Sequence, residues 1–81
     1  MTFVKGDFIK EVVFCEEVVW EVISHHKRLK GGRISFDACV IFTEGRLKHT
    51  IGCKHTLTTS LTTPVSTNRF TLVGENHYLV P

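Results

Sequence analysis

The side chains most capable of chemistry in this chain are its three cysteines and five histidines. Cys53 and His55 stand two positions apart, so on a strand they would point to the same face, and His49 lies shortly before them. A structural zinc site usually contains ligand pairs two to four residues apart, and only this Cys–His pair is close. We therefore expect no metal and no cofactor. The scattered cysteines, in a sequence without a secretory signal, predict reduced thiols and no disulfide.

A thiol nucleophile and a pair of carboxylates are the other catalytic options. Cys39 or Cys53 would need a histidine base in hydrogen-bond reach and a backbone site for the oxyanion, and neither has a flanking glycine turn. Glu16 and Glu17 are adjacent, so on a strand they would point to different sides, and we expect both to be solvated. The sequence thus predicts that the protein is not an enzyme, and a zinc- or thiol-dependent enzyme is a third reading.

The strongest binding signal is positive charge in the middle of the chain. Residues 1–24 carry two lysines against five acidic residues, whereas residues 25–55 carry seven cations against two acids. Such cations can neutralise phosphates or attract an acidic protein. The basic segments 25–33 and 46–55 are predicted to be loops, and no aromatic residue interleaves their charges. The residues predicted to contact a partner are His25, His26, Lys27, Arg28, Lys30, Arg33, Arg46 and Lys48.

The elements that position these side chains are clearest after residue 32. Apolar residues alternate from 33 to 42, which predicts a strand with one face on a core. Segment 43–46 predicts a turn, and 47–51 alternates again, so it predicts the second strand of a hairpin. The Thr-rich segment 56–67 is compatible with a strand or a loop, and 69–73 and 77–80 predict two short closing strands.

Segment 8–30 is compatible with two structures. A helix could begin after Asp7 as N-cap and end at Gly31, with acidic residues early and basic residues late. However, seven of the residues from 9 to 23 are Val or Ile, which favour strands. A strand pair needs a turn at 15–17, which contains no Gly, Asn or Pro. We favour two strands with Trp20 in the core; the alternative is an α+β protein with one helix over 8–30 packed on a hairpin sheet.

The stretch FVKGDFI at residues 3–9, followed by VWEVI at 19–23, resembles the opening of small SH3-like barrels, including KOW-type domains and many short phage proteins. In those domains a Gly-Asp turn begins the first strand, and a strand of the W-x-V type pairs back on it. The resemblance implies an all-β, SH3-like barrel of about five strands. It also implies a small phage-type accessory or host-modulating protein that covers a partner's surface.

Taken together, these patterns predict one domain over residues 1–81 and a cytoplasmic location, without membrane association. The predicted function is a non-catalytic binding module that contacts an acidic protein. The alternative is a nucleic-acid-binding barrel that uses the basic loops 25–33 and 46–55. Three apolar residues lie where alternation predicts solvent: Val19, Ile23 and Ile41. They indicate a docking face or a homodimer as further possibilities.

Overall fold

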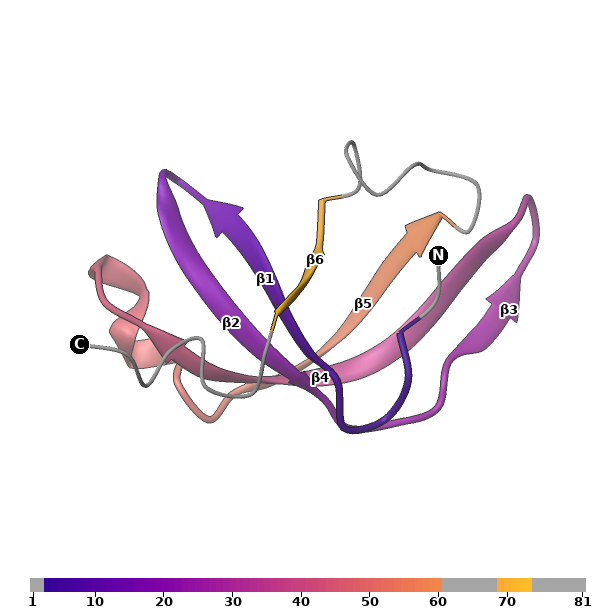
Figure 1. Ribbon diagram of the computed structural model, residues 1–81, viewed down its shortest axis with the longest axis horizontal. Helices are drawn as coiled ribbons and strands as arrows, with labels where there is room; N and C mark the ends of the chain where they lie inside the picture. The colour runs from indigo at the N-terminus through magenta and orange to yellow at the C-terminus, as the bar shows by residue number, and fades with distance from the viewer. Residues whose placement is uncertain (1–2, 61–68, 74–81) are drawn as a thin grey trace.

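The computed structural model describes residues 3–60 and 69–73 and contains one antiparallel sheet of six strands (Figure 1). The all-β prediction is confirmed, and the helix predicted as an alternative over 8–30 is wrong because three strands occupy that segment. In the described part of the chain, no helix has the length and apolar character needed to cross a membrane. The elements are β1 (Phe8–Val13), β2 (Glu16–Val22), β3 (Lys27–Leu29), β4 (Arg33–Thr43), the 3₁₀ helix η1 (Arg46–Thr50), β5 (Lys54–Ser60) and β6 (Thr71–Val73).

The long strand β4 organises the sheet. Its first three residues pair with β3, and its second half pairs with β2 along the same edge. β5 pairs with Arg33–Cys39 along the opposite edge, because Ser35 has partners in both β3 and β5. Eleven residues of strand span about 35 Å if straight, so β4 separates two ends of the molecule. Figure 1 shows the β3–β4 turn at one end, and η1 with the β1–β2 turn at the other.

The described strands do not close into a barrel. β6 pairs with β1 through residues 8–10, and among the described residues no ladder joins β6 to β5. The predicted barrel is therefore wrong in closure, whereas the six antiparallel strands are near the predicted number of about five. Figure 1 shows the result as a strongly bent sheet, with β1 and β2 on one side and β5 on the other.

The core lies on the concave side of the bent sheet. The prediction for Trp20 is confirmed, since it is only 6% exposed and its flanking Val18 and Val22 are also buried. Three phenylalanines from distant parts of the chain meet edge to face with ring centroids about 6 Å apart: Phe3, Phe36 and Phe70. The expectation that Val19, Ile23 and Ile41 face solvent is wrong for Val19, which is 1% exposed, while the other two are half-buried.

A tight turn begins β1. The Val4 N–H donates to the Asp7 carboxylate at 2.9 Å, and Gly6 adopts a φ of +97°, which a side chain would resist. The Gly6 N–H then donates to the Val22 carbonyl, and the Val22 N–H donates to the Asp7 carbonyl. The turn is thereby fastened to the end of β2, which fixes where β1 starts.

The hairpin expected after β4 has a different second strand. Residues 47–51 do not form a strand; Arg46–Thr50 is the 3₁₀ helix η1, and β4 pairs with β5 instead. The first part of the Thr-rich segment belongs to β5, and of the strand expected at 69–73 the last three residues, Thr71–Val73, form β6. The rest of the Thr-rich segment, 61–67, and the strand expected at 77–80 lie outside the described residues.

Candidate binding surfaces at the two ends of β4

The structure divides the predicted partner-binding residues between the two ends of β4. Residues 25–33 surround β3 and the β3–β4 turn, whereas Arg46 and Lys48 lie on η1, on the order of 30 Å away along β4. The segment 25–33 is also not a loop throughout, because Lys27–Leu29 forms an edge strand paired with β4. Segment 46–55 likewise contains η1 and the start of β5. The eight residues therefore form two surfaces and not one.

At the η1 end, the β1–β2 turn holds an aromatic side chain in solvent. Val13 pairs with Glu16, so Phe14 and Cys15 alone make the turn. Both have positive φ, at 51° and 65°, as a type I′ turn requires. A left-handed conformation costs a residue with a Cβ about 1–2 kcal/mol, and Asn-Gly is the usual choice. Phe14 is nevertheless 77% exposed, so burial of its ring does not offset the strain.

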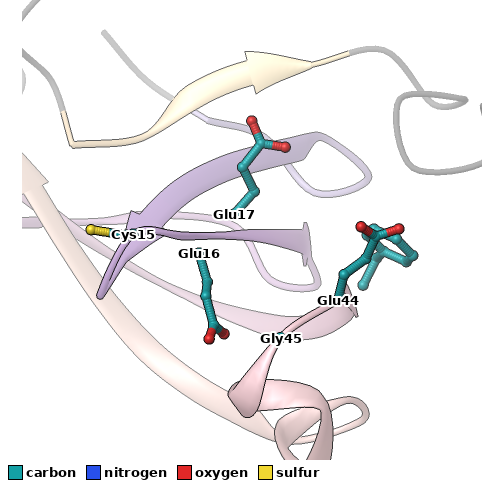
Figure 2. A pocket seen from close by; sticks show the side chains of 6 residues that line it. Cys15, Glu16, Glu17, Glu44 and Gly45 are labelled. Atoms are coloured by element: carbon teal, nitrogen blue, oxygen red, sulfur yellow. The ribbon is translucent and has the colours of Figure 1, made fainter.

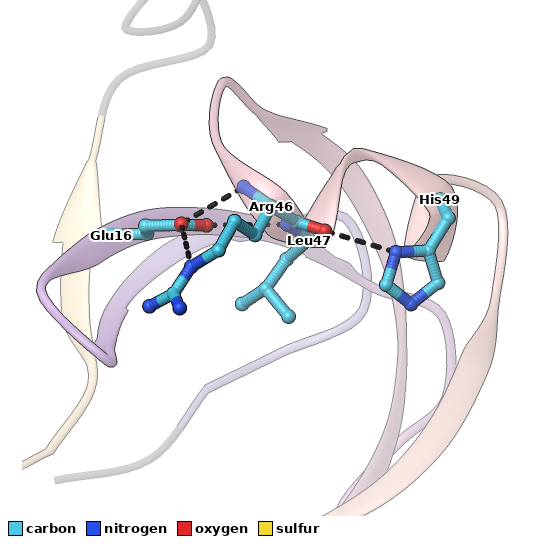
Figure 3. Close-up of polar contacts among 4 residues, drawn as sticks. All are labelled: Glu16, Arg46, Leu47 and His49. Carbon is cyan, nitrogen blue, oxygen red and sulfur yellow. Dashed lines mark hydrogen bonds and ion pairs between the residues drawn. The ribbon is translucent and has the colours of Figure 1, made fainter.

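Glu16 connects this turn to η1 (Figure 3). Its Oε1 accepts the Arg46 backbone N–H at 2.8 Å, and its Oε2 accepts the Leu47 N–H at 3.2 Å. The first N–H groups of a helix have no partner within the helix, so one carboxylate here satisfies two of them. The Arg46 Nε also lies 3.4 Å from Oε1. The expectation that Glu16 is only solvated is wrong, because its side chain is 18% exposed and fully engaged.

The surroundings of Glu16 hold it ionised. The hydrogen bond from the Arg46 backbone N–H is the largest contribution that lowers the pKa of Glu16 below its ordinary value, and the Leu47 N–H adds to it. Gly45 leaves room for the carboxylate, since a Cβ at this position would overlap the carboxyl group of Glu16 and displace it. The contact joins β2 to a residue about thirty positions later, so η1 is positioned by tertiary structure.

Glu16 lines two neighbouring hollows. One, of about 320 Å³, is lined by Phe14, Glu16, Arg46, Leu47 and His49, and is mostly apolar with a cationic rim. The other, of about 310 Å³, is lined by Cys15, Glu16, Glu17, Phe42, Glu44 and Gly45, and is acidic. Figure 2 shows Glu16 and Glu17 pointing to opposite sides of β2, as alternation predicts. Lys48 lines neither hollow.

Short hydrogen bonds within η1 hold in place the η1 residues that line the first of these hollows. His49 Nδ1 lies 3.0 Å from the Arg46 carbonyl oxygen, and the Thr50 hydroxyl donates to the Leu47 carbonyl at 2.6 Å. Leu47 itself packs against the core. The Arg46 side chain remains 83% exposed despite its contact with Glu16. The hollow is thus a fixed apolar surface with a positive charge at its edge.

At the other end of β4, the β3–β4 turn carries cations, and its backbone is not strained. Gly31 and Gly32 supply the positive φ values, 78° and 72°, that the turn needs. Lys27, Arg28 and Lys30 are exposed, and none of them makes an ion pair with another described residue. All three described ion pairs instead involve acidic residues of β1 and β2: Glu11, Glu16 and Glu17.

The residues considered for catalysis or metal binding are dispersed. Cys39 is half-buried on β4 with its thiol near the Val40 carbonyl, and Cys53 is exposed before β5. His55 packs edge to face against Trp20, with ring centroids 5.5 Å apart. The described residues contain no group of three or more His, Cys, Asp or Glu side chains arranged to hold a metal. These cysteine and histidine side chains therefore lie at separate places on the described strands and loops.

Sequence reasoning missed the two residues that shape the η1 end, Phe14 and Glu16. A turn without Gly or Asn was the available signal for Phe14, because a two-residue turn at that position forces both residues into the left-handed region. No local signal identifies Glu16, since its partners lie in η1. Comparison with protein-family models, curated proteins and solved structures gave no significant match. The function is therefore inferred from the geometry of the chain itself.

Proposed function

We propose that this protein is a non-catalytic, cytoplasmic binding module that contacts another protein through the β1–β2 turn and η1. The observation that supports it most is Phe14, an exposed aromatic residue held in a left-handed conformation. Strained backbone in native structures is concentrated at functional sites. Exposed aromatic residues beside an apolar hollow are the usual anchors of protein interfaces.

The two hollows define the chemistry of the partner. An apolar side chain of the partner would lie against Phe14 and Leu47, while a carboxylate next to it would contact Arg46 at the rim. A basic group of the same partner would face Glu17 and Glu44. The cationic rim favours the acidic partner expected from the sequence, and a second copy of this chain is the alternative occupant. The SH3-like resemblance of residues 3–23 stays a prediction that agrees with a binding role.

The test is an affinity capture that uses the double variant Phe14→Asn with Cys15→Gly as one bait. Asn-Gly is the preferred sequence for a type I′ turn, so this variant removes the aromatic ring while keeping the hairpin. The wild-type protein and Val4→Ser serve as the other baits, because Val4 is also an exposed apolar residue but lies outside both hollows. Each capture is run with untreated lysate and with nuclease-treated lysate.

We expect the wild type and Val4→Ser to capture the same protein and the double variant to lose it. Titration of the captured protein should show at least roughly 30-fold weaker binding, because removing an aromatic hot spot costs about 2 kcal/mol or more. Equal capture by the double variant would place the contact elsewhere. Loss of capture after nuclease treatment would show that a nucleic acid mediates it.

A further inference from the structure

The face of β3, β4 and β5 that is turned away from the core carries cations and hydroxyl groups in register. Paired residues of antiparallel strands point to the same face, so cross-strand partners form rows across the sheet. Ile34 and Phe36 of β4 are buried, so the residues that alternate with them lie on the outer face. Two rows cross this end of the sheet: Lys27–Ser35–Thr58 and Leu29–Arg33–Ser60.

The charge on this face is available to a ligand. The Arg33 guanidinium donates to the Thr58 hydroxyl at 3.2 Å, and Lys27 is exposed without an ion-pair partner among the described residues. Lys30 adds a third exposed cation at the turn, whereas Arg28 pairs with the buried Ile34 and so lies on the opposite face of β3. Asp37 contributes the opposing charge, but its carboxylate accepts the Thr56 hydroxyl at 2.7 Å, and the three cations Lys27, Lys30 and Arg33 outweigh it. A polar hollow of about 260 Å³ beside it is lined by Ser24, His25, Lys27, Ser35, Phe36, Asp37 and Thr56.

We infer that this outer face binds the phosphate backbone of double-stranded nucleic acid without reading its sequence. Lys, Arg, Ser and Thr side chains are the groups that donate to phosphate oxygens in such complexes. Phe14 is the one exposed aromatic residue of the described chain, and it lies at the opposite end of β4, so stacking on single-stranded bases is not favoured here. An acidic protein fits less well, because Leu29 is the one exposed large apolar residue on these rows and a protein interface needs an apolar centre.

The experiment measures binding of the full chain to a fluorescent 20-base-pair DNA duplex of arbitrary sequence by anisotropy across a salt series. The test variant is Lys27→Gln with Lys30→Gln. The control variant is Lys5→Gln with Lys48→Gln, which removes the same charge from exposed lysines away from this face. A second test variant, Ser35→Ala with Thr58→Val, removes hydroxyl groups and no charge. Poly-glutamate and a single strand of the same length are the competing ligands, and urea midpoints confirm that all variants fold.

Three phosphate contacts predict a slope of about −2.7 for the logarithm of the association constant against the logarithm of salt concentration, with micromolar affinity at low salt. The test variant should reduce the slope by about 1.8, and the control should leave it nearly unchanged. The hydroxyl variant should weaken binding severalfold at an unchanged slope. Equal loss of duplex affinity in the test and control variants would mean that binding depends only on net charge, which contradicts the inference. Tighter binding of poly-glutamate would assign the face to an acidic protein, tighter binding of the single strand would exclude duplex recognition, and no duplex binding at low salt would overturn the inference.

Discussion

The two hairpin turns at opposite ends of the sheet solve the same backbone problem with different residues. The β3–β4 turn places Gly31 and Gly32 where φ is positive, and a Cβ at Gly31 would meet no atom within 4 Å. The β1–β2 turn places Phe14 and Cys15 in the same region of φ. Glycine adopts this conformation freely, whereas a residue with a side chain is strained there.

This difference separates a turn built for stability from a turn that presents a side chain. The glycine turn costs the fold little, and the charges around it are solvated. The Phe14–Cys15 turn is less stable than Asn-Gly would be, and it holds an apolar ring in water. Because sequences usually relieve strain that has no use, the strained turn is the better indicator of function. The following predictions test this contrast, from the largest expected effect to the smallest.

Both turns depend on the core between them, so Trp20→Ala should affect the two ends equally. Trp20 is buried beneath the middle of the sheet, and truncation of a buried Trp typically costs about 3–5 kcal/mol. We expect a large decrease in the urea midpoint of unfolding. Unfolding is monitored with one probe at each end of the sheet. Transitions at different urea concentrations for the two ends would show that they fold independently, which contradicts a single core.

Exchanging the character of the two turns should change stability in opposite directions. Phe14→Asn with Cys15→Gly should stabilise the protein by about 1–2 kcal/mol, because it relieves left-handed strain. Gly31→Ala should destabilise it by a similar amount, about 1–2 kcal/mol, since its space is open and the penalty is conformational. Free energies of unfolding from urea titrations measure both. A stabilising Gly31→Ala or a destabilising Asn-Gly turn would refute the contrast.

Acid should loosen the η1 end and leave the β3–β4 end intact. The folded-state pKa of Glu16 is lowered from its ordinary value of 4.5. Its stabilising contribution is therefore fully present above the unfolded pKa and is lost as pH falls through the lowered folded pKa. The amide resonances of Arg46 and Leu47 should follow this titration in nuclear magnetic resonance spectra. Glu16→Gln should abolish their pH dependence, and Gly45→Ala should return the pKa of Glu16 toward its ordinary value by displacing the carboxylate.

The basic turn should matter least for folding. Replacing Lys27, Arg28 and Lys30 together with alanine should change the free energy of unfolding by less than about 0.5 kcal/mol, because exposed side chains without partners contribute little. Combined with the Asn-Gly turn, the effects should add within about 0.5 kcal/mol, since the two sites are far apart. A larger coupling energy would mean that β4 transmits structural change between the ends.

The strands were predictable where side-chain alternation and residue type agree, as in 33–42 and around Trp20. The prediction for 47–51 was wrong because five alternating residues do not distinguish a strand from a short helix whose first N–H groups are satisfied from elsewhere. Glu16 on β2 accepts hydrogen bonds from these N–H groups, and no local pattern encodes that contact. The closed barrel was an inference from resemblance, and the described strands leave the sheet open.

The candidate surfaces were predictable in composition but not in position. Arg33 and Arg46 are close in sequence, and a short strand between them would have kept them together. The eleven residues of β4 place them at opposite ends instead. Phe14 was overlooked because an apolar residue next to other apolar residues predicts a strand interior, and only the register of Val13 with Glu16 places it in the turn.

The pairing of β6 with β1 has a consequence for the order of folding. Three residues near the end of the chain pair with Phe8, Ile9 and Lys10 near its beginning. Closing so long a loop for so short a ladder costs entropy that few hydrogen bonds offset, so this ladder should form last. The hairpins β1–β2 and β4–β5 join nearer neighbours in sequence and should form first. We expect the backbone amides of Thr71–Val73 to exchange with deuterium sooner than those of β2 and β4, through local opening that leaves the rest of the sheet folded.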